Sequence, residues 1–387
     1  MFKIHDVTQW EANFTISKAI EIAAFTLMSR IGWKPLHDEV FIKPNIGANS
    51  KDVNTDPNVV RGIIHYLQTI GIEKITIGEG AVETECESSD YNFRLGWDKM
   101  AAEEKVDLAD LNHTDRTTVD FMGGGKIGLP TIMLGKSYIN VAKMKTHMQT
   151  LVSLCVKNQK GILDSTTRKM FHKFGLHEPI ARLAQIVRPE LCVVDGYIAV
   201  EGNGPGNWGT LRKVGKLIAG DDMVEVDSVC CGMMGIDPDE VEHLRILRGN
   251  TFTNKFEELA LVKPFKRPDN TFKMFKTHLS PENACSACLS SVGEMTKLAR
   301  KSWLGVKVFA RKGLLQRLDI VVGSPEDAPC SHGYLVFYGD CARKIAKTYP
   351  EYPFIQGCPP VSKRALEHLS TFKRRSVDRI LRAAEED

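Results

Sequence analysis

Long apolar runs are missing from this 387-residue sequence, and so is a strong excess of one charge. No stretch reaches about 18 consecutive apolar residues, the length that suggests a membrane-spanning helix. The N-terminus, MFKIHDVTQWEANF, contains no apolar run of signal-peptide length. With 51 basic and 48 acidic residues the net charge is +3, without the basic bias of a dedicated nucleic-acid-binding protein. The sequence therefore predicts a cytoplasmic protein that binds neither membrane nor nucleic acid, and it leaves the oligomeric state open.

Cysteine is the residue type that stands out, with ten in the chain. Because the cytoplasm keeps thiols reduced, we expect no disulfide framework, and metal binding or redox chemistry becomes the better explanation for cysteines that cluster. Four of the ten cysteines lie in apolar runs and are predicted to be buried side chains, namely Cys155, Cys192, Cys230 and Cys231. Cys86, in an acidic stretch, has no assigned role.

Strand-like and helix-like segments alternate along most of the chain. In the first part, strands are predicted at 39–43, 74–77, 106–111, 138–142, 191–194 and 216–219, and helices at 58–70, 178–187 and 223–234. The alternation resumes after residue 285, with strands at 319–322, 335–338 and 354–355. The fold class predicted is α/β, with mostly parallel sheets, helices on both faces, and a smaller C-terminal α/β cysteine-rich domain.

The predicted division of the chain has three parts. Residues 1–248 form an α/β domain, 249–284 a linker or wrapping segment of low periodicity, and 285–387 a C-terminal iron–sulfur-binding α/β domain.

Four cysteines of the C-terminal domain share one local pattern, in which a strand or turn ends, a cysteine follows and a helix begins. Cys285 and Cys288 form a C-x-x-C at a helix start, Cys341 follows LVFYG, and Cys358 follows FIQG. Carboxyl ends of parallel strands lie along one edge of a sheet, so these cysteines can converge. Helix N-termini favour thiolates, which are the form that metals bind. The pattern predicts a [4Fe-4S] cluster, with zinc as the alternative and Cys330 as a rival ligand.

A second group of polar residues follows the predicted strands of the first domain. Lys43 and Asn45 follow the first strand and suit an anionic or carbonyl group, although a simple turn also explains them. Glu79 lies between two glycines after the second strand, as an acid–base or metal-ligating candidate. Asp195, Asp222 and Asp227 also lie near strand ends and could bind a metal, although helix N-capping is the more economical role for Asp222.

The most polar strand end is KMKTH, which contains Lys143, Lys145 and His147. Lys157 and Asn158 lie shortly after it, and the intervening TLVSLCV is predicted to be a buried helix that brings both ends to one rim. Clustered lysines attract a carboxylate or phosphate. We therefore expect Lys143, Lys145, His147 and Glu79 to be catalytic, and Lys43, Asn45, Lys157 and Asn158 to bind a small anionic substrate.

Seven motifs in order resemble the family called domain of unknown function 362: IKPNIG, IGEG, KMKTH, KNQKG, VVDGYIAVEGNGPG, AGDDMVEVD and MMGIDP. The resemblance spans roughly residues 38–245. It implies the α/β fold and an association with iron–sulfur segments, but no reaction. The chain lacks the ferredoxin run C-x-x-C-x-x-C-x-x-x-C-P, so the four separated cysteines would replace it. The ending GCPP is similar to the cluster-ligating turn of hydrogenase and respiratory complex I small subunits.

Three classes of function fit these motifs. The first is an iron–sulfur oxidoreductase acting on a small anionic substrate, with a redox partner protein. The second is a non-redox lyase or isomerase that uses a metal or cluster as a Lewis acid. The third is a non-enzymatic electron carrier, or a protein with structural zinc.

Overall fold

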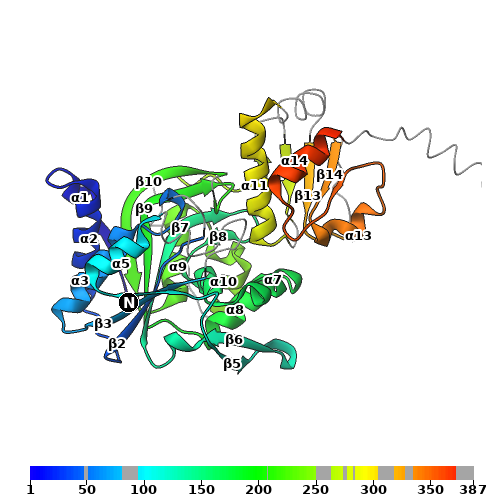
Figure 1. Ribbon diagram of the computed structural model, residues 1–387. Helices are drawn as coiled ribbons and strands as arrows, with labels where there is room; N and C mark the ends of the chain where they lie inside the picture. The colour runs from blue at the N-terminus through cyan, green and yellow to red at the C-terminus, as the bar shows by residue number, and fades with distance from the viewer. Residues whose placement is uncertain are drawn as a thin grey trace, which may run out of the picture. The chain divides into compact units, whose positions relative to one another are not determined.

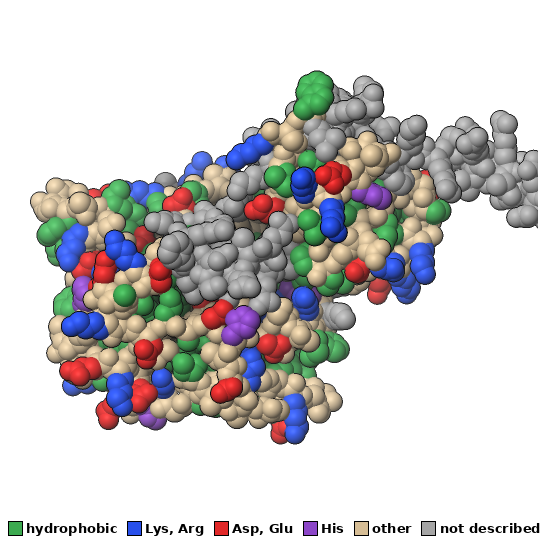
Figure 2. Space-filling view, viewed as in Figure 1, with side chains coloured by type: hydrophobic (Ala, Val, Ile, Leu, Met, Phe, Trp, Pro, Cys, Tyr) green, Lys and Arg blue, Asp and Glu red, His purple; other side chains and the backbone are tan. Residues whose placement is uncertain are grey.

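The computed structural model describes residues 1–47, 51–80, 95–206, 208–249, 263–272, 277–281, 284–303, 318–326 and 334–371. The chain divides into two compact units, Met1–Pro268 and Asp269–Asp387. Each unit has a main sheet of its own (Figure 1). Within the described residues, no helix is long and apolar enough to cross a membrane. On the face shown in Figure 2, basic and acidic side chains are intermingled over the described surface.

The first unit contains an eight-stranded mixed sheet in the order β1-β10-β9-β7-β2-β3-β4, with β8 paired to β7. Its strands are β1 (Phe2–Asp6), β2 (Glu39–Lys43), β3 (Lys74–Glu79), β4 (Asp107–Asp110), β7 (Ser137–His147), β8 (Leu151–Ser153), β9 (Leu191–Gly202) and β10 (Gly209–Gly220). The five strands from β9 to β4 are parallel, whereas β10 and β1 add to them antiparallel. A separate hairpin pairs β5 (Arg116–Asp120) with β6 (Lys126–Pro130). The predicted α/β class is confirmed.

Helices cover both faces of this sheet, because successive side chains of a buried strand point to opposite sides. Along β7, Ile139 and Val141 face one core, while Tyr138 and Ala142 face the other. The first core is closed by α2 (Ile16–Ile31), α3 (Pro57–Thr69) and α5 (Trp97–Glu104). The second is closed by α6 (Cys155–Asn158), α8 (His177–Ile186) and α9 (Met223–Met234). The other α-helices in the described part of this unit are α1 (Thr8–Glu11), α7 (Ser165–Lys173) and α10 (Glu242–Arg248).

Local sequence explains where the helices beside the strand ends begin. The Asp56 side chain accepts a hydrogen bond from the Asn58 amide at the start of α3, and Pro57 occupies the first turn. Asp222 caps α9 through the Glu225 amide, as its position after a strand predicts. The cap of α3 lies beside β9, where the Asp56 amide donates to Asp195. The cap of α9 lies at the opposite edge of the sheet, because β10 is antiparallel and its last residue, Gly220, pairs with Cys192 at the start of β9.

The predicted helix over TLVSLCV is wrong at its start. Leu151–Ser153 is instead the short strand β8, which pairs antiparallel with the end of β7, and α6 begins only at Cys155. The chain reverses tightly after His147, and Leu151 has a left-handed backbone with φ of 62°. A short buried apolar run does not distinguish strand from helix by periodicity, and here pairing with β7 decides.

The second unit contains a five-stranded sheet in the order β11-β12-β13-β14-β15, parallel except for β11. Its strands are β11 (Thr271–Phe272), β12 (Thr277–Ser280), β13 (Leu318–Val322), β14 (Tyr334–Tyr338) and β15 (Phe354–Ile355). Its α-helices in the described part are α11 (Ser286–Lys301), α13 (Arg343–Ala346) and α14 (Ser362–Thr371). The first two strands lie inside the predicted linker 249–284, much of which is outside the described residues.

Candidate functional site

The order in which the chain visits the parallel strands of the first unit reverses between the neighbouring strands β2 and β7. From β2 the chain proceeds outward to β3 and β4 on one side, and the later strands β7 and β9 lie on the other. Such a switch point opens a crevice beyond the carboxyl ends of the strands, where α/β proteins bind their ligands. The polar residues singled out in the sequence lie at these strand ends.

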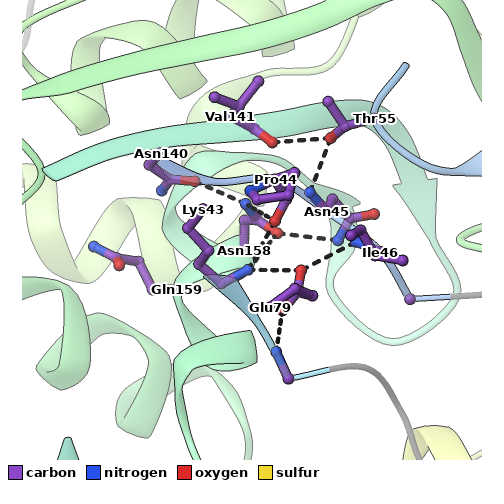
Figure 3. A network of polar contacts seen from close by, with 12 residues as sticks. Lys43, Pro44, Asn45, Ile46, Thr55, Glu79, Asn140, Val141, Asn158 and Gln159 are labelled. Carbon is purple, nitrogen blue, oxygen red and sulfur yellow. Dashed lines mark hydrogen bonds and ion pairs between the residues drawn. The ribbon is translucent and has the colours of Figure 1, made fainter. Parts of the chain in front are cut away.

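Lys43, at the end of β2, is fully buried and forms an ion pair of 2.9 Å with Glu79 at the end of β3. Its Nζ also donates to the Pro44 carbonyl and to Asn158 Oδ1, at 3.0 and 3.2 Å (Figure 3). Burial lowers the pKa of Lys43, and the Glu79 carboxylate opposes this effect. The amide of Ile46 donates to the same carboxylate oxygen as Lys43. Glu79 therefore holds both the lysine and the turn after β2.

Asn158, at the end of α6, connects β2 with β7. Its Oδ1 accepts from Asn45 Nδ2 at 3.0 Å, and its Nδ2 donates to Asn140 Oδ1 at 2.7 Å (Figure 3). Asn140 in turn donates to the Cys155 carbonyl at 2.9 Å. This relay fixes the amide orientations, because each side chain uses a defined donor and acceptor.

A second buried ion pair joins Lys143 of β7 to Asp195 of β9, with 2.8 Å between Nζ and Oδ2. The Asp195 carboxylate also accepts from the amides of Asp56 and Tyr197. Burial and the nearby Asp195 charge raise the pKa of Asp56. Asp195 therefore serves in a structural ion pair here, although the sequence suggested a metal ligand.

Lys145 differs from these two lysines in its partner. Its side chain is 3% exposed and donates to the amide oxygen of Asn45 at 2.6 Å. Among the residues that the structure describes, no carboxylate forms an ion pair with Lys145 or Lys157. Burial lowers the pKa of Lys145 to about 7, and the charges of Lys143 and Lys157 act in the same direction. Burial lowers the pKa of Lys157 to about 8.

His147 is held as a neutral hydrogen-bond donor. Its Nδ1 faces the amides of Gln149 and Thr150, at 3.1 and 3.4 Å, so Nδ1 accepts and the ring proton lies on Nε2. Burial lowers the pKa of His147 well below its ordinary value, and the charges of Lys157 and Lys160 add to the effect. The arrangement supplies cationic and N–H groups in excess of carboxylates, which suits an anionic ligand.

Five predicted residues thus lie in one hydrogen-bonded network at the switch point, namely Lys43, Asn45, Glu79, Lys145 and Asn158. Lys143 forms its own pair with Asp195, and Lys157 acts on Lys145 and His147 through its charge. Sequence reasoning missed Asn140, whose signal was an asparagine in the middle of the buried strand YINVA. It also missed the pairing of Lys43 with Glu79 and of Lys143 with Asp195, because no spacing in the sequence reports contacts across a sheet.

In the second unit, Cys285, Cys341 and Cys358 lie within electrostatic reach of Cys288. Cys285 is the residue before α11, Cys288 lies in its first turn, and Cys341 and Cys358 follow β14 and β15. A hydrogen bond with Cys285 and burial raise the pKa of the Cys288 thiol, and the thiolates of Cys285, Cys358 and Cys341 raise it further. Thiols that compete for protons in this way are those a bound cation would stabilise as thiolates.

The absence of a side chain at Gly339 allows the backbone to approach Cys288 closely. Gly339, with φ of 91°, lies so close that a β-carbon there would be 3.1 Å from Cys288 Sγ. Within the described residues, however, no group of three or more His, Cys, Asp or Glu side chains has the arrangement to hold a metal ion. Cys330 and Cys86 lie outside the described residues. The four cysteines predicted to be buried, Cys155, Cys192, Cys230 and Cys231, are each 0% exposed, which confirms that prediction.

The fold and the polar strand ends define an α/β protein with buried lysines at the carboxyl edge of its parallel strands. Residues 40–232 match the family model described as "Domain of unknown function (DUF362)", and the chain belongs to this family. A thylakoid-associated protein of Synechocystis sp. is 28% identical over 222 residues, which are 52% of this chain and 64% of that protein. The chain therefore matches less than two thirds of that relative's length. A crystal structure from Thermotoga maritima gives a TM-score of 0.32 at 13% identity, covering 50% of this chain and 54% of that one.

Proposed function

We propose that the chain is an iron–sulfur protein in which Cys285, Cys288, Cys341 and Cys358 hold a [4Fe-4S] cluster. The observation that supports this most is the effect of Cys285, Cys341 and Cys358 on the Cys288 thiol, which requires all three to lie within electrostatic reach of Cys288. Thiolates are the usual ligands of such clusters, and amides at a helix N-terminus such as that of α11 can hydrogen-bond cluster sulfurs. When bound, the cluster would supply one-electron transfer.

The proposal extends to an oxidoreductase acting on a small anionic substrate at the switch-point crevice. Lys145 and Lys157 would supply positive charge, and the Nε2–H of His147 would supply a directed hydrogen bond. Glu79 would position Lys43 and the turn after β2, because both of its oxygens accept hydrogen bonds. A redox partner protein would exchange electrons with the cluster, and the compartment proposed is the cytoplasm.

Anaerobic purification followed by iron, zinc and acid-labile sulfide analysis tests the cluster. We expect about four iron and four sulfide per chain, as the cluster formula requires. The Cys288→Ser variant should lose both, whereas Cys192→Ser, a buried cysteine of the first unit, should retain them. Zinc without sulfide would instead support a structural zinc site, and the absence of both metals would remove the proposal.

Isothermal titration calorimetry with acetate, lactate, pyruvate and inorganic phosphate tests the anion site. Replacing Lys145 by Met should weaken binding about 10- to 100-fold, since a charged hydrogen bond contributes about 1.5–3 kcal/mol. Lys74→Met is the matched control, because Lys74 is 75% exposed and pairs with Glu39. Equal binding by both variants, or no binding by the wild type, would contradict an anion site.

A further inference from the structure

Lys145, which would supply positive charge to the anion site when protonated, also has the surroundings of a nucleophilic amine when neutral. Lys43 and Lys143 each form an ion pair with a buried carboxylate, at 2.9 and 2.8 Å. Lys145 lies on the same strand as Lys143, two residues further, but the hydrogen bond of its Nζ goes to the neutral amide oxygen of Asn45. A buried lysine beside other cations loses its proton readily, and a neutral lysine amine adds to carbonyl carbons.

The relay around Asn45 also fixes how the amine is oriented. Asn45 Nδ2 donates to Asn158 Oδ1, which leaves Asn45 Oδ1 as the acceptor for the Lys145 amine. The amine therefore uses an N–H toward Asn45, and its lone pair is directed elsewhere. The charge of Lys157 acts on His147, so the two groups lie near each other. Together they supply a cation and an N–H donor for a carboxylate.

We propose that Lys145 forms an imine with the carbonyl carbon of a small oxo-carboxylate bound at the switch-point crevice. This inference rests on the proposed anion site and names its substrate class. The amine nitrogen adds to the carbonyl carbon, the carbonyl oxygen takes up a proton, and the resulting carbinolamine loses one water to give the carbon–nitrogen double bond. Two amine hydrogens leave with the carbonyl oxygen as that water, and no electrons are transferred.

The lowered pKa of about 7 for Lys145 supports this role. At pH 7 its neutral fraction exceeds that of an ordinary lysine by roughly a thousandfold. Imine formation should therefore be selective for this residue at neutral pH, and its yield should level off by about pH 8 instead of rising toward pH 10.

The test is borohydride trapping on the full chain, purified anaerobically and incubated with pyruvate, glyoxylate or oxoglutarate. Borohydride reduces an imine to a stable secondary amine, which peptide mapping by mass spectrometry locates. We expect the adduct at Lys145 with at least one oxo acid, none with lactate, and none at this position in Lys145→Arg. Exposed Lys74 serves as the internal control and should remain unmodified.

Calorimetry on the same samples separates the two proposals. If pyruvate and lactate both bind but no oxo acid labels Lys145, the imine is wrong and the anion site stands. If the adduct appears only on exposed lysines, the imine is also wrong. If none of the anions binds and nothing labels Lys145, both proposals fail together.

Discussion

Breaking the buried pair between Lys43 and Glu79 should destabilise the first unit strongly. Lys43 is 0% exposed and Glu79 6%, so removal of one partner leaves a charge that solvent cannot reach. Loss of one member of such a pair costs about 3–5 kcal/mol of unfolding free energy. We expect this loss for Lys43→Met and for Glu79→Gln, and a smaller loss for the double variant than the sum of the two. Lys74→Met, which breaks an exposed pair, should cost at most about 1 kcal/mol.

Urea unfolding followed by tryptophan fluorescence measures these free energies for the first unit. Four of the five tryptophans lie within Met1–Pro268, and Trp97 there is 1% exposed. The fifth, Trp303, is 81% exposed and should change its fluorescence little on unfolding. If Lys43→Met costs no more than Lys74→Met, or if the double variant is additive, the ion pair does not organise the site as we describe.

Three further substitutions test the buried charges of the same unit. Because the folded pKa of Lys145 is about 7 and its ordinary value 10.5, the unfolded chain binds more protons between these values. From pH 7 to pH 10, the unfolding free energy of the wild type should therefore rise relative to that of Lys145→Met by up to about 4 kcal/mol. If the unfolding free energies of the two proteins change with pH in parallel, the pKa of Lys145 is not lowered. Burial raises the pKa of Asp227 to about 7, so the wild type should lose unfolding free energy as pH rises from about 4 to 7. Urea titrations of Asp227→Asn should show no such loss. A β-carbon on Gly161 would overlap Glu79 Oε1, so Gly161→Ala should lose about 2 kcal/mol or more in thermal unfolding, whereas Gly47→Ala, with open space, should not.

The sequence predicted the fold class and most parallel strands because each is a short apolar run followed by a turn. It could not predict that Gly209–Gly220 runs antiparallel to its neighbour, or that Phe2–Asp6 adds an edge strand to it. Strand direction depends on which distant segment supplies the hydrogen bonds, and no local pattern reports this.

The residues of the candidate site could be predicted from the sequence, but their hydrogen-bond and ion-pair partners could not. Lysines and an asparagine at strand ends were visible as polar residues after apolar runs, since strand ends of a parallel sheet share an edge. The different partners of Lys143 and Lys145 were not visible, because Asp195 of β9 forms an ion pair with Lys143 while Lys145 donates to Asn45. For the cysteines, the repeated strand–cysteine–helix pattern was enough to select four residues that the structure brings within electrostatic reach.

Mössbauer spectroscopy of anaerobically purified protein, grown on enriched iron, tests the central claim most directly because it detects the iron itself in any oxidation state. The account predicts cluster iron in the wild type and in Cys192→Ser, and its loss in Cys288→Ser. A wild-type protein that contains zinc on these cysteines and no cluster iron would contradict the account.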